Sequence, residues 1–428
     1  MRIEKDSFGE VTFEDSVLYG IQTYRTGPHM SFSAKQLAAY PSYIRSLAEV
    51  KKAAAIANNK AGIINHETLI AICHACDILI SGQFHDQFPV DVFHGGGSIG
   101  INMNINEVIS SISNIPFDVI NASQSTADVC HSAIRITLMR ETDNLVKELQ
   151  LIEKAAIRIG DRFVNIQTIS RTCLQDALPT PLSTLFYTFA DQIKKRRGQI
   201  EMAASLLLNI NLGGTVIGSG RGATASYREN AVAILSEVCD LPLTQRKNLY
   251  VAAQYPDDLA DLSSSLRILS VTLIKFSKDL RLLSSGPDAG FFEISLPSIQ
   301  AGSSFFPGKV NPVMPEMMVQ CGLLVNGNDH AIQSVFDHGE LYLNIWEGMA
   351  GILLYDNLNM LTKALQLFRT HCFEGIQANK AVCQKYSTSS IPFIMELKEK
   401  YGYEQAGNWM NLYSIEELKQ MHEKGEIV

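Results

Sequence analysis

Three stretches of the chain carry apolar residues at helical spacing over more than twenty residues, with almost no helix-breaking residue inside them. They are residues 126–163, 182–212 and 259–283, and residues 317–372 can hold two more such helices joined near residues 337–339. The mean helix of a globular protein has about 11–12 residues, so these helices are unusually long. Their apolar residues fall on more than one face, which is typical of helices buried among other helices. The sequence therefore predicts a mainly α fold with a central bundle of long helices.

The segments on either side of the bundle have a different character. Residues 1–40 are rich in Phe and Tyr, are punctuated by glycines and show no long helical period. Helical spacing begins near Ser42, where Ile44, Leu47 and Val50 recur three residues apart. The last forty residues are short, charged segments that we interpret as a small appended domain. We expect other copies of the chain to cover the apolar surface that remains on the long helices.

Composition limits the classes of partner. Hydrophobic residues make up 46% of the 428 residues and charged residues 19%, which excludes a disordered chain. The formal net charge of −8 argues against nucleic acid as a partner. No run of 18 apolar residues occurs and residues 1–11 lack the apolar core of a signal peptide, so we expect no membrane association and a cytoplasmic location. The lone pair Cys73 and Cys76 has no second ligand pair nearby, so we expect no metal site there.

The segment 302–312 carries the clearest chemistry. Its sequence, GSSFFPGKVNP, offers the hydroxyls of Ser303 and Ser304, the ammonium of Lys309 and the carboxamide of Asn311 between glycines and prolines. A mobile loop with these donors suits a carboxylate ligand. The alternative, an ordinary surface turn rich in Ser and Gly, leaves the two phenylalanines of the loop unexplained.

This segment resembles the signature G-S-S-x-x-P-x-K-x-N-P of the aspartase/fumarase superfamily, closest to the aspartate ammonia-lyase and class II fumarase branch. Other blocks resemble the same family in the same order along the chain. They are GINMNINEV at 100–108, SQSTAD at 123–128 and SRTCLQDALP at 170–179, with LYGIQT at 18–23 and LGGTVIG at 212–218. The resemblance covers residues 6 to 384.

The resemblance implies a fold, an assembly and a reaction. It implies a three-domain architecture with boundaries at 1–124, 125–384 and 385–428, the last domain being shortened. It implies a homotetramer whose helical core is shared and whose active sites each collect residues from three subunits. The reaction is elimination from a small succinate-type dicarboxylate, giving fumarate or a related alkene through an aci-carboxylate intermediate. The family uses no organic cofactor for this chemistry.

The resemblance also assigns roles to individual residues. Ser303 is the base, and its alkoxide needs nearby positive charge and N–H donors because a serine hydroxyl is a poor base. Glu316 takes the place of a family acid that lies behind the residues in contact with substrate. The residues expected to bind the two substrate carboxylates are Ser125, Thr126, Thr172, Ser304, Lys309 and Asn311, with Asn102 from the N-M-N block.

The sequence departs from the family on the side of the leaving group. Ile99, Ala127 and Cys173 stand where aspartases have Thr, Asn and His. A missing buried hydrogen bond costs about 1–3 kcal/mol, so we expect plain aspartate to bind less well and the leaving group to be different or N-substituted. Alternatives are an ordinary aspartase, a fumarase, and a non-catalytic scaffold. His131 lies one helical turn after Ala127 and could replace the lost imidazole, as could Cys173 acting as a weak acid.

Two other motifs carry less weight. The glycine-rich segment 213–222 lacks the G-K-[ST] of a phosphate-binding P-loop and does not follow a predicted strand. His94 to Gly97 resembles an esterase oxyanion motif, but no G-x-S-x-G nucleophile accompanies it. We therefore assign no catalytic role to either segment from the sequence.

Overall fold

The computed structural model describes residues 1–427 and is mainly helical, as predicted. Its five long helices are α6 (Thr126–Phe163), α7 (Ser183–Leu206), α10 (Asp257–Leu283), α11 (Val313–Asp337) and α12 (Glu347–His371). Helix α6 begins and ends at the predicted residues. Helix α7 ends six residues earlier than predicted, because the chain there forms the short strand β5 (Asn209–Ile210), which pairs with β6 (Thr244–Gln245).

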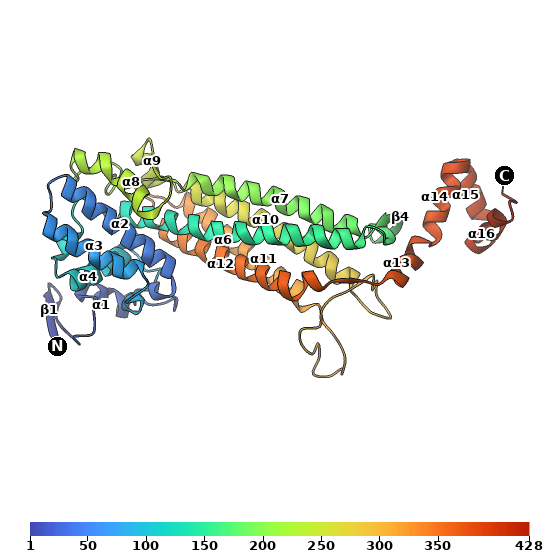
Figure 1. Cartoon of the computed structure of the whole chain (residues 1–428), viewed down its shortest axis with the longest axis horizontal. Coiled ribbons are helices and arrows are strands. Elements are labelled where there is room, and N and C mark those ends of the chain that lie inside the picture. Colours follow the sequence, from blue (N-terminus) through green and yellow to red (C-terminus); the bar gives the residue numbers. More distant parts are fainter. Residues whose placement is uncertain (428) are drawn as a thin grey trace. The chain divides into compact units, whose positions relative to one another are not determined.

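The chain divides into two compact units. Unit 1 comprises residues 1–146, 198–268 and 323–362, and unit 2 comprises residues 147–197, 269–322 and 363–428. In both units, segments of the five long helices lie side by side (Figure 1). The division into domains at residues 124 and 384 remains a prediction.

Unit 1 surrounds its share of the long helices with shorter elements. Its other helices are α1 (Ile21–Met30), α2 (Pro41–Lys60), α3 (His66–Ile80), α4 (Ile99–Ser113), α5 (Phe117–Ile120), α8 (Ala225–Cys239) and α9 (Leu249–Gln254), with 3-10 turns at Leu37–Ala39 and His85–Gln87. Strands β1 (Arg2–Asp6) and β2 (Gly9–Phe13) form an antiparallel hairpin in which Arg2 faces Phe13. Helix α2 packs against α3 and α8, and the predicted apolar positions Ile44, Leu47 and Val50 are fully buried.

Polar contacts also join the long helices within unit 1. Ser263 on α10 donates to Asp329 on α11 at 2.7 Å, and Asn328 on α11 donates to Asn357 on α12 at 2.7 Å. Buried polar groups of this kind need partners, and each such bond contributes about 0.5–1.5 kcal/mol. These bonds fix the relative rotation of α10, α11 and α12 within unit 1.

Aromatic side chains form the core of unit 2. Phe189 on α7 stacks on Phe276 on α10 with 3.7 Å between ring centroids, and Phe186 packs edge-on against Phe163 on α6 and Phe276. Phe373, in a 3-10 turn at Phe373–Gly375, closes this cluster. Unit 2 also contains two antiparallel strand pairs. Strand β3 (Gln167–Thr172) pairs with β4 (Gln175–Pro181), and β7 (Ile294–Ser295) pairs with β8 (Gln377–Ala378).

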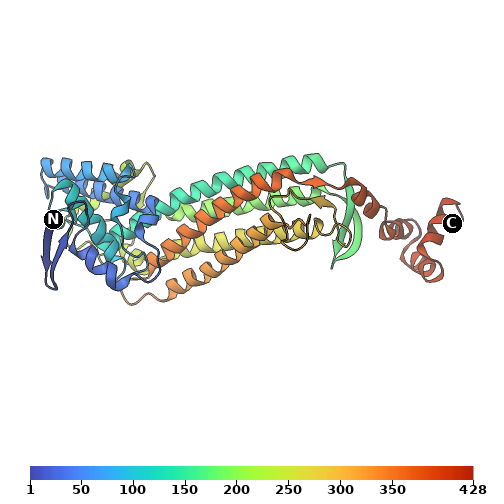
Figure 2. The same ribbon diagram turned by 90° about the horizontal axis from the view of Figure 1, so that it is seen from below.

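The chain ends in four short helices, α13 (Lys380–Ser387), α14 (Ser390–Tyr401), α15 (Tyr403–Leu412) and α16 (Ile415–Glu423). Figure 2 shows α14 to α16 folding back on one another near the C-terminus. Leu397, Ala406, Leu418 and Ile427 form a separate apolar cluster between them. Helix α16 starts with a capping box between Ser414 and Glu417. Across residues 1–427, every helix is too short or too polar to span a bilayer.

Candidate active site

The loop at 302–312 closes on itself through one backbone and one side-chain hydrogen bond in unit 2. The N–H of Gly302 donates to the carbonyl of Lys309 at 2.9 Å, and Asn311 Nδ2 donates to the carbonyl of Gly302 at 2.6 Å. A Cβ atom at residue 302 would lie 2.5 Å from the Lys309 carbonyl oxygen, so only glycine fits this crossing. Lys309 and Asn311 are thereby held at the base of one closed loop.

Ser303 lies at the start of this loop, and its hydroxyl oxygen accepts two backbone N–H groups. The donors are Phe305 at 3.0 Å and Phe306 at 2.9 Å. Two N–H donors directed at one oxygen stabilise negative charge on it, as an oxyanion hole does. The phenyl rings of both donors are largely exposed, with Phe305 at 80%. The loop therefore supplies part of what a serine alkoxide needs, through residues adjacent to the serine.

Two other donors of the loop line a pocket of about 390 Å³ in unit 2. Lys309 and Asn311 line it together with the hydroxyl-bearing residues Ser284, Ser295 and Ser298. Ser304 is exposed on the loop. Glu316 lies in the first turn of α11, 3.5 Å from Arg281, and both side chains are partly exposed.

Thr172 and Cys173 lie at the end of the β3–β4 hairpin. Thr172 pairs with Gln175, and the two residues between them, Cys173 and Leu174, both have positive φ, +54° and +62°. This is the conformation of a tight two-residue hairpin turn, which normally selects Asn or Gly. Cys173 is exposed, so the strained turn presents a thiol to solvent.

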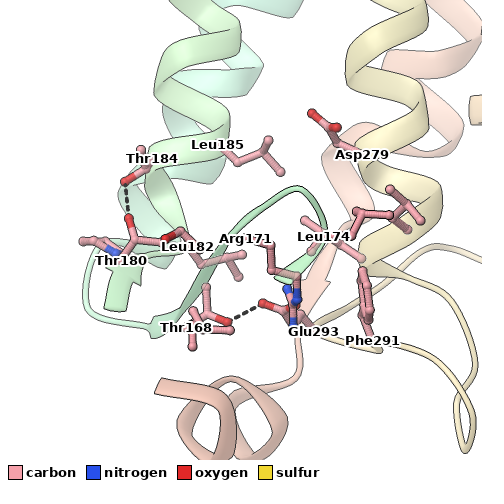
Figure 3. A pocket seen from close by; sticks show the side chains of 15 residues that line it. Thr168, Arg171, Leu174, Thr180, Leu182, Thr184, Leu185, Asp279, Phe291 and Glu293 are labelled. Carbon is pink, nitrogen blue, oxygen red and sulfur yellow. Dashed lines mark hydrogen bonds and ion pairs between the residues drawn. The ribbon is translucent and has the colours of Figure 1, made fainter. Parts of the chain in front are cut away.

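Figure 3 shows the base of this hairpin, which borders a cavity of about 320 Å³. Arg171 pairs with the fully buried Glu293, and its guanidinium lies 4.2 Å from the ring centroid of Phe291. Glu293 also accepts a hydrogen bond from Thr168. The hairpin and the loop at 302–312 thus line two different pockets of unit 2.

In unit 1 the start of α6 meets the start of α4. Asn102 Nδ2 donates to Thr126 Oγ1 at 3.1 Å, so the structure brings these two predicted residues together. Ser125 precedes Thr126, and the first-turn N–H groups of a helix favour an anion. The N–H of Ser125 is occupied, because it donates to Asp128 at 2.8 Å.

Asp128 explains the glycine-rich segment that follows residue 212. Its buried carboxylate accepts the N–H groups of Gly213 and Thr215, both at 3.1 Å, besides that of Ser125. Burial raises the pKa of Asp128, and the three N–H donors oppose that rise. The start of this segment therefore fastens the N-terminus of α6.

Sequence reasoning missed Lys51, a fully buried cation near the α6 N-terminus. Its Nζ donates to Asn121 Oδ1 at 3.1 Å and to Gln124 Oε1 at 2.9 Å. Asn121 Oδ1 also accepts from Asn102 at 3.2 Å, so one amide links Lys51 to the predicted substrate-binding residue. Burial lowers the pKa of Lys51 to about 8. The only signal in the sequence was a lysine at a position that helical spacing places on the buried face of α2.

Three residues on the predicted leaving-group side lie in unit 1. Ile99 is the first residue of α4 and is 39% exposed, whereas Ala127 is buried. His131 is buried one turn further along α6, with Nδ1 2.8 Å from Glu347 Oε2. Arg135 also pairs with Glu347, and its Nε lies 2.6 Å from Asp258. Burial alone would raise the pKa of Glu347, but Arg135 and His131 lower it to about 2.

His94, which the sequence left without a role, caps α4. The residue before α4, Ser98, is in the left-handed region and makes no side-chain cap. His94 Nε2 instead accepts the N–H of Ile101 at 3.2 Å, while Nδ1 lies 2.7 Å from the Gly95 carbonyl. This pattern fits the neutral ring protonated on Nδ1. His94 therefore positions the helical turn that carries Ile99 and Asn102.

Among residues 1–427, no group of three or more His, Cys, Asp or Glu is arranged to hold a metal ion.

Known proteins resemble the chain over most of its length. A family described as "Lyase" matches residues 9–327. Aspartate ammonia-lyase of Helicobacter pylori is 39% identical over 95% of this chain and 90% of its own, and that of Corynebacterium glutamicum is 38% identical over 94% and 79%. A cobalt-bound structure described as fumarate lyase:delta crystallin from Brucella melitensis superposes with a TM-score of 0.93 at 36% identity, covering 99% of this chain and 93% of that one. Class II fumarase from Schistosoma mansoni gives 0.92 at 26% identity, covering 96% and 92%. The chain therefore belongs to the aspartase/fumarase superfamily of lyases.

Proposed function

We propose that the chain eliminates a group from a succinate-type dicarboxylate to give fumarate or a related alkene. The observation that carries this proposal is the pair of N–H groups on Ser303 Oγ, at 3.0 and 2.9 Å. A serine held in this way is suited to act as a base, because its alkoxide is stabilised before substrate arrives. The names of the relatives support the same reaction class.

In this proposal each set of donors has one task. Ser303 removes the proton from the carbon next to one carboxylate, and the aci-carboxylate that forms is held by Ser304, Ser125 and Thr126. Lys309, Asn311 and Thr172 hold the second carboxylate. Stabilising the charge that develops on the first carboxylate is the largest contribution to the rate in such a step.

Each site is completed by other copies of the chain, in a homotetramer. Supporting this, the hairpin with Thr172 and the loop with Ser303 line two separate pockets of unit 2. Exposed apolar residues on the long helices, including Met202 at 73% and Leu323 at 59%, offer surface for such contacts. A fully active monomer in sedimentation and assay would contradict this assembly.

The proposed location of the protein is the cytoplasm. The eight cysteines are all free, in keeping with this reducing compartment.

The leaving group differs from ammonia, being more apolar or substituted on nitrogen. Support comes from the exposed Ile99 and from the absence of a polar group on Ala127. His131 does not simply replace the lost donor, because its Nδ1 is held by Glu347.

Purified protein mixed with fumarate and a panel of nucleophiles tests the proposal through the loss of fumarate absorbance. The panel contains ammonia, water, hydroxylamine, alkylamines, amino acids and thiols. Rapid consumption with ammonia alone makes the protein an ordinary aspartase. Consumption only with a substituted nucleophile supports the altered leaving group, and no consumption at all by an intact tetramer contradicts a fumarate-forming lyase.

The base is tested by Ser303→Ala, which should lower turnover about a thousandfold, the scale of general-base catalysis. Ser81→Ala, at the exposed C-cap of α3, is the matched control and should leave turnover unchanged. Turnover near the wild-type level in Ser303→Ala would show that another group is the base.

A further inference from the structure

An apolar cavity of about 480 Å³ lies in unit 1 beside the first turn of α4. Phe32, Phe93, Ile345, Trp346, Met349 and Leu353 provide its large side chains, and the turn Gly95–Ser98 forms one wall. Volumes of 300–1,000 Å³ with mainly apolar and aromatic lining are typical of small-molecule sites.

The cavity offers no charge and little hydrogen bonding. Its lining contains no Asp, Glu, Lys or Arg. Both ring nitrogens of His94 are engaged, by Gly95 and Ile101, and the indole N–H of Trp346 donates to the His338 carbonyl at 3.0 Å. A ligand group that enters is therefore uncharged and apolar, because a polar one would lose its hydration without gaining partners.

The turn that forms one wall of the cavity adjoins the predicted substrate-binding residues. A Cβ at Gly96 would lie 2.9 Å from Ile99 Cγ2, so the Ile99 side chain lies against the cavity wall. The Ser98 carbonyl, in the same wall, accepts the N–H of Asn102 at 3.2 Å, and Asn102 donates to Thr126 at 3.1 Å. One helical turn, about 5.4 Å, thus separates the cavity wall from the side chain that contacts Thr126.

Several of the large side chains that line the cavity are also exposed to solvent in the single chain. Trp346 is 42% exposed, Met349 39% and Phe32 75%. Gly348 lets helix α12 approach the turn at Ser98 closely, because a Cβ at residue 348 would lie 2.4 Å from Ser98 Oγ. Exposed aromatic surface gains free energy when an apolar group covers it, with each buried methylene tightening binding about fourfold.

We propose that this cavity binds an apolar, preferably aromatic, substituent on the leaving nitrogen of the substrate. The assignment rests on the proposed function, because that function places the leaving group beside Ile99. The substrate class is then an N-alkyl or N-arylalkyl aspartate. Elimination breaks the C–N bond, whose electron pair goes to the protonated nitrogen as it leaves as a neutral amine. Ser303 takes the proton from the neighbouring carbon, so fumarate and the amine are the products.

Isothermal titration of Ser303→Ala with N-benzyl-aspartate and with aspartate measures the subsite, because this variant should bind both ligands without turning them over. It should bind N-benzyl-aspartate at least about tenfold more tightly, as expected from burial of several carbon atoms. Equal affinity for the two ligands would overturn the proposal. In the reverse reaction, the KM for benzylamine should lie below that for methylamine by a similar factor.

Met349→Trp fills the cavity and should abolish the preference for the benzyl group. Met410→Trp, at a methionine of similar exposure on α15, is the matched control and should keep it. If Met349→Trp dissociates the oligomer while the wild type shows no benzyl preference, the cavity is an interface between copies and the proposal is wrong.

Failure of the proposed function has a different signature. If the protein binds N-benzyl-aspartate with the Met349-dependent preference but consumes no fumarate with any nucleophile, the subsite stands and the lyase assignment falls. If fumarate is consumed with ammonia or water but no apolar amine is preferred, the lyase stands and the subsite falls.

Discussion

Nδ1 of His131 lies 2.8 Å from Oε2 of Glu347, inside a buried group of charges that also holds Arg135 and Asp258. The imidazole that the sequence offered as a replacement for the family histidine is therefore already anchored on one side. Only Nε2 remains to face another group. His131 is thus part of a structural network first, and any contact with substrate has to be made through that second nitrogen.

Glu347→Gln should destabilise the protein by about 3–5 kcal/mol, because it leaves buried His131 without its carboxylate and Arg135 with Asp258 alone. Chemical denaturation measures this loss. Glu374→Gln, which removes a carboxylate that is 41% exposed, is the control and should cost less than about 1 kcal/mol.

The same carboxylate predicts acid sensitivity. The pKa of Glu347 is about 2 in the folded chain, below its usual 4.5, so its contribution is complete above pH 4.5. It is lost as the pH falls from 4.5 toward 2, where the unfolded chain binds the extra proton. Glu347→Gln should therefore show a shallower loss of stability over that range, and an identical slope in both proteins would contradict this role.

Lys51 predicts a second rise in stability, at alkaline pH. Its pKa is about 8 when folded and 10.5 when unfolded, so between these values the unfolded chain binds more protons and rising pH favours the fold. The free energy of unfolding of the wild type, relative to Lys51→Met, should rise by about 2 kcal/mol between pH 7 and 9.5. Lys60→Met, at an exposed α2 residue, controls for the general effect of removing a lysine. A constant difference across this range would show that Lys51 titrates normally.

His94→Ala should cost about 1 kcal/mol of stability, the usual effect of losing a helix cap, and should raise KM because the turn with Asn102 is released. His94→Gln should restore both, since its amide oxygen can accept the Ile101 N–H. His85→Ala, which removes a ring bonded to the Leu79 carbonyl, is the control. Its stability should fall without a change in KM. If the role of His94 is purely structural, His94→Ala will lower stability without changing KM, as His85→Ala does.

Restoring the family's polar groups at exposed positions should favour ammonia. Ile99→Thr with Cys173→His should raise kcat/KM for ammonia addition to fumarate about tenfold or more, since one regained hydrogen bond is worth about 1–2 kcal/mol. Cys73→His, at a partly buried position on α3, is the control. No gain with ammonia would mean that these positions do not contact the leaving group.

Local patterns were predictable from the sequence, whereas pairings between distant segments were not. The bounds of α6 followed from apolar spacing, which depends on neighbouring residues alone. The early end of α7 depends on pairing between Asn209 and Thr244, which no local pattern contains. For the same reason, no local pattern indicated that Glu107 accepts the N–H groups of Gly20 and Thr23, at 2.9 and 3.0 Å.

The candidate site divides in the same way. Ser303, Lys309 and Asn311 are neighbours in sequence, so their motif predicted one loop, and the chain folds it as one. The link from Lys51 through Asn121 to Asn102 joins three segments that only the fold brings together. The roles of the site residues in catalysis remain predictions that the experiments above test.

Cys173 and Leu174, the two residues with positive φ at the hairpin tip, lower the stability of the fold, and Cys173 also carries the thiol on the predicted leaving-group side. Each L-residue in this conformation costs about 1–2 kcal/mol, and Asn-Gly in place of Cys173 and Leu174 would recover much of that cost. A redesign guided by thermal stability would therefore choose these positions early. It would also delete the thiol from the predicted leaving-group side, so a more heat-resistant enzyme with Asn-Gly at this tip would have a different preference for its nucleophile.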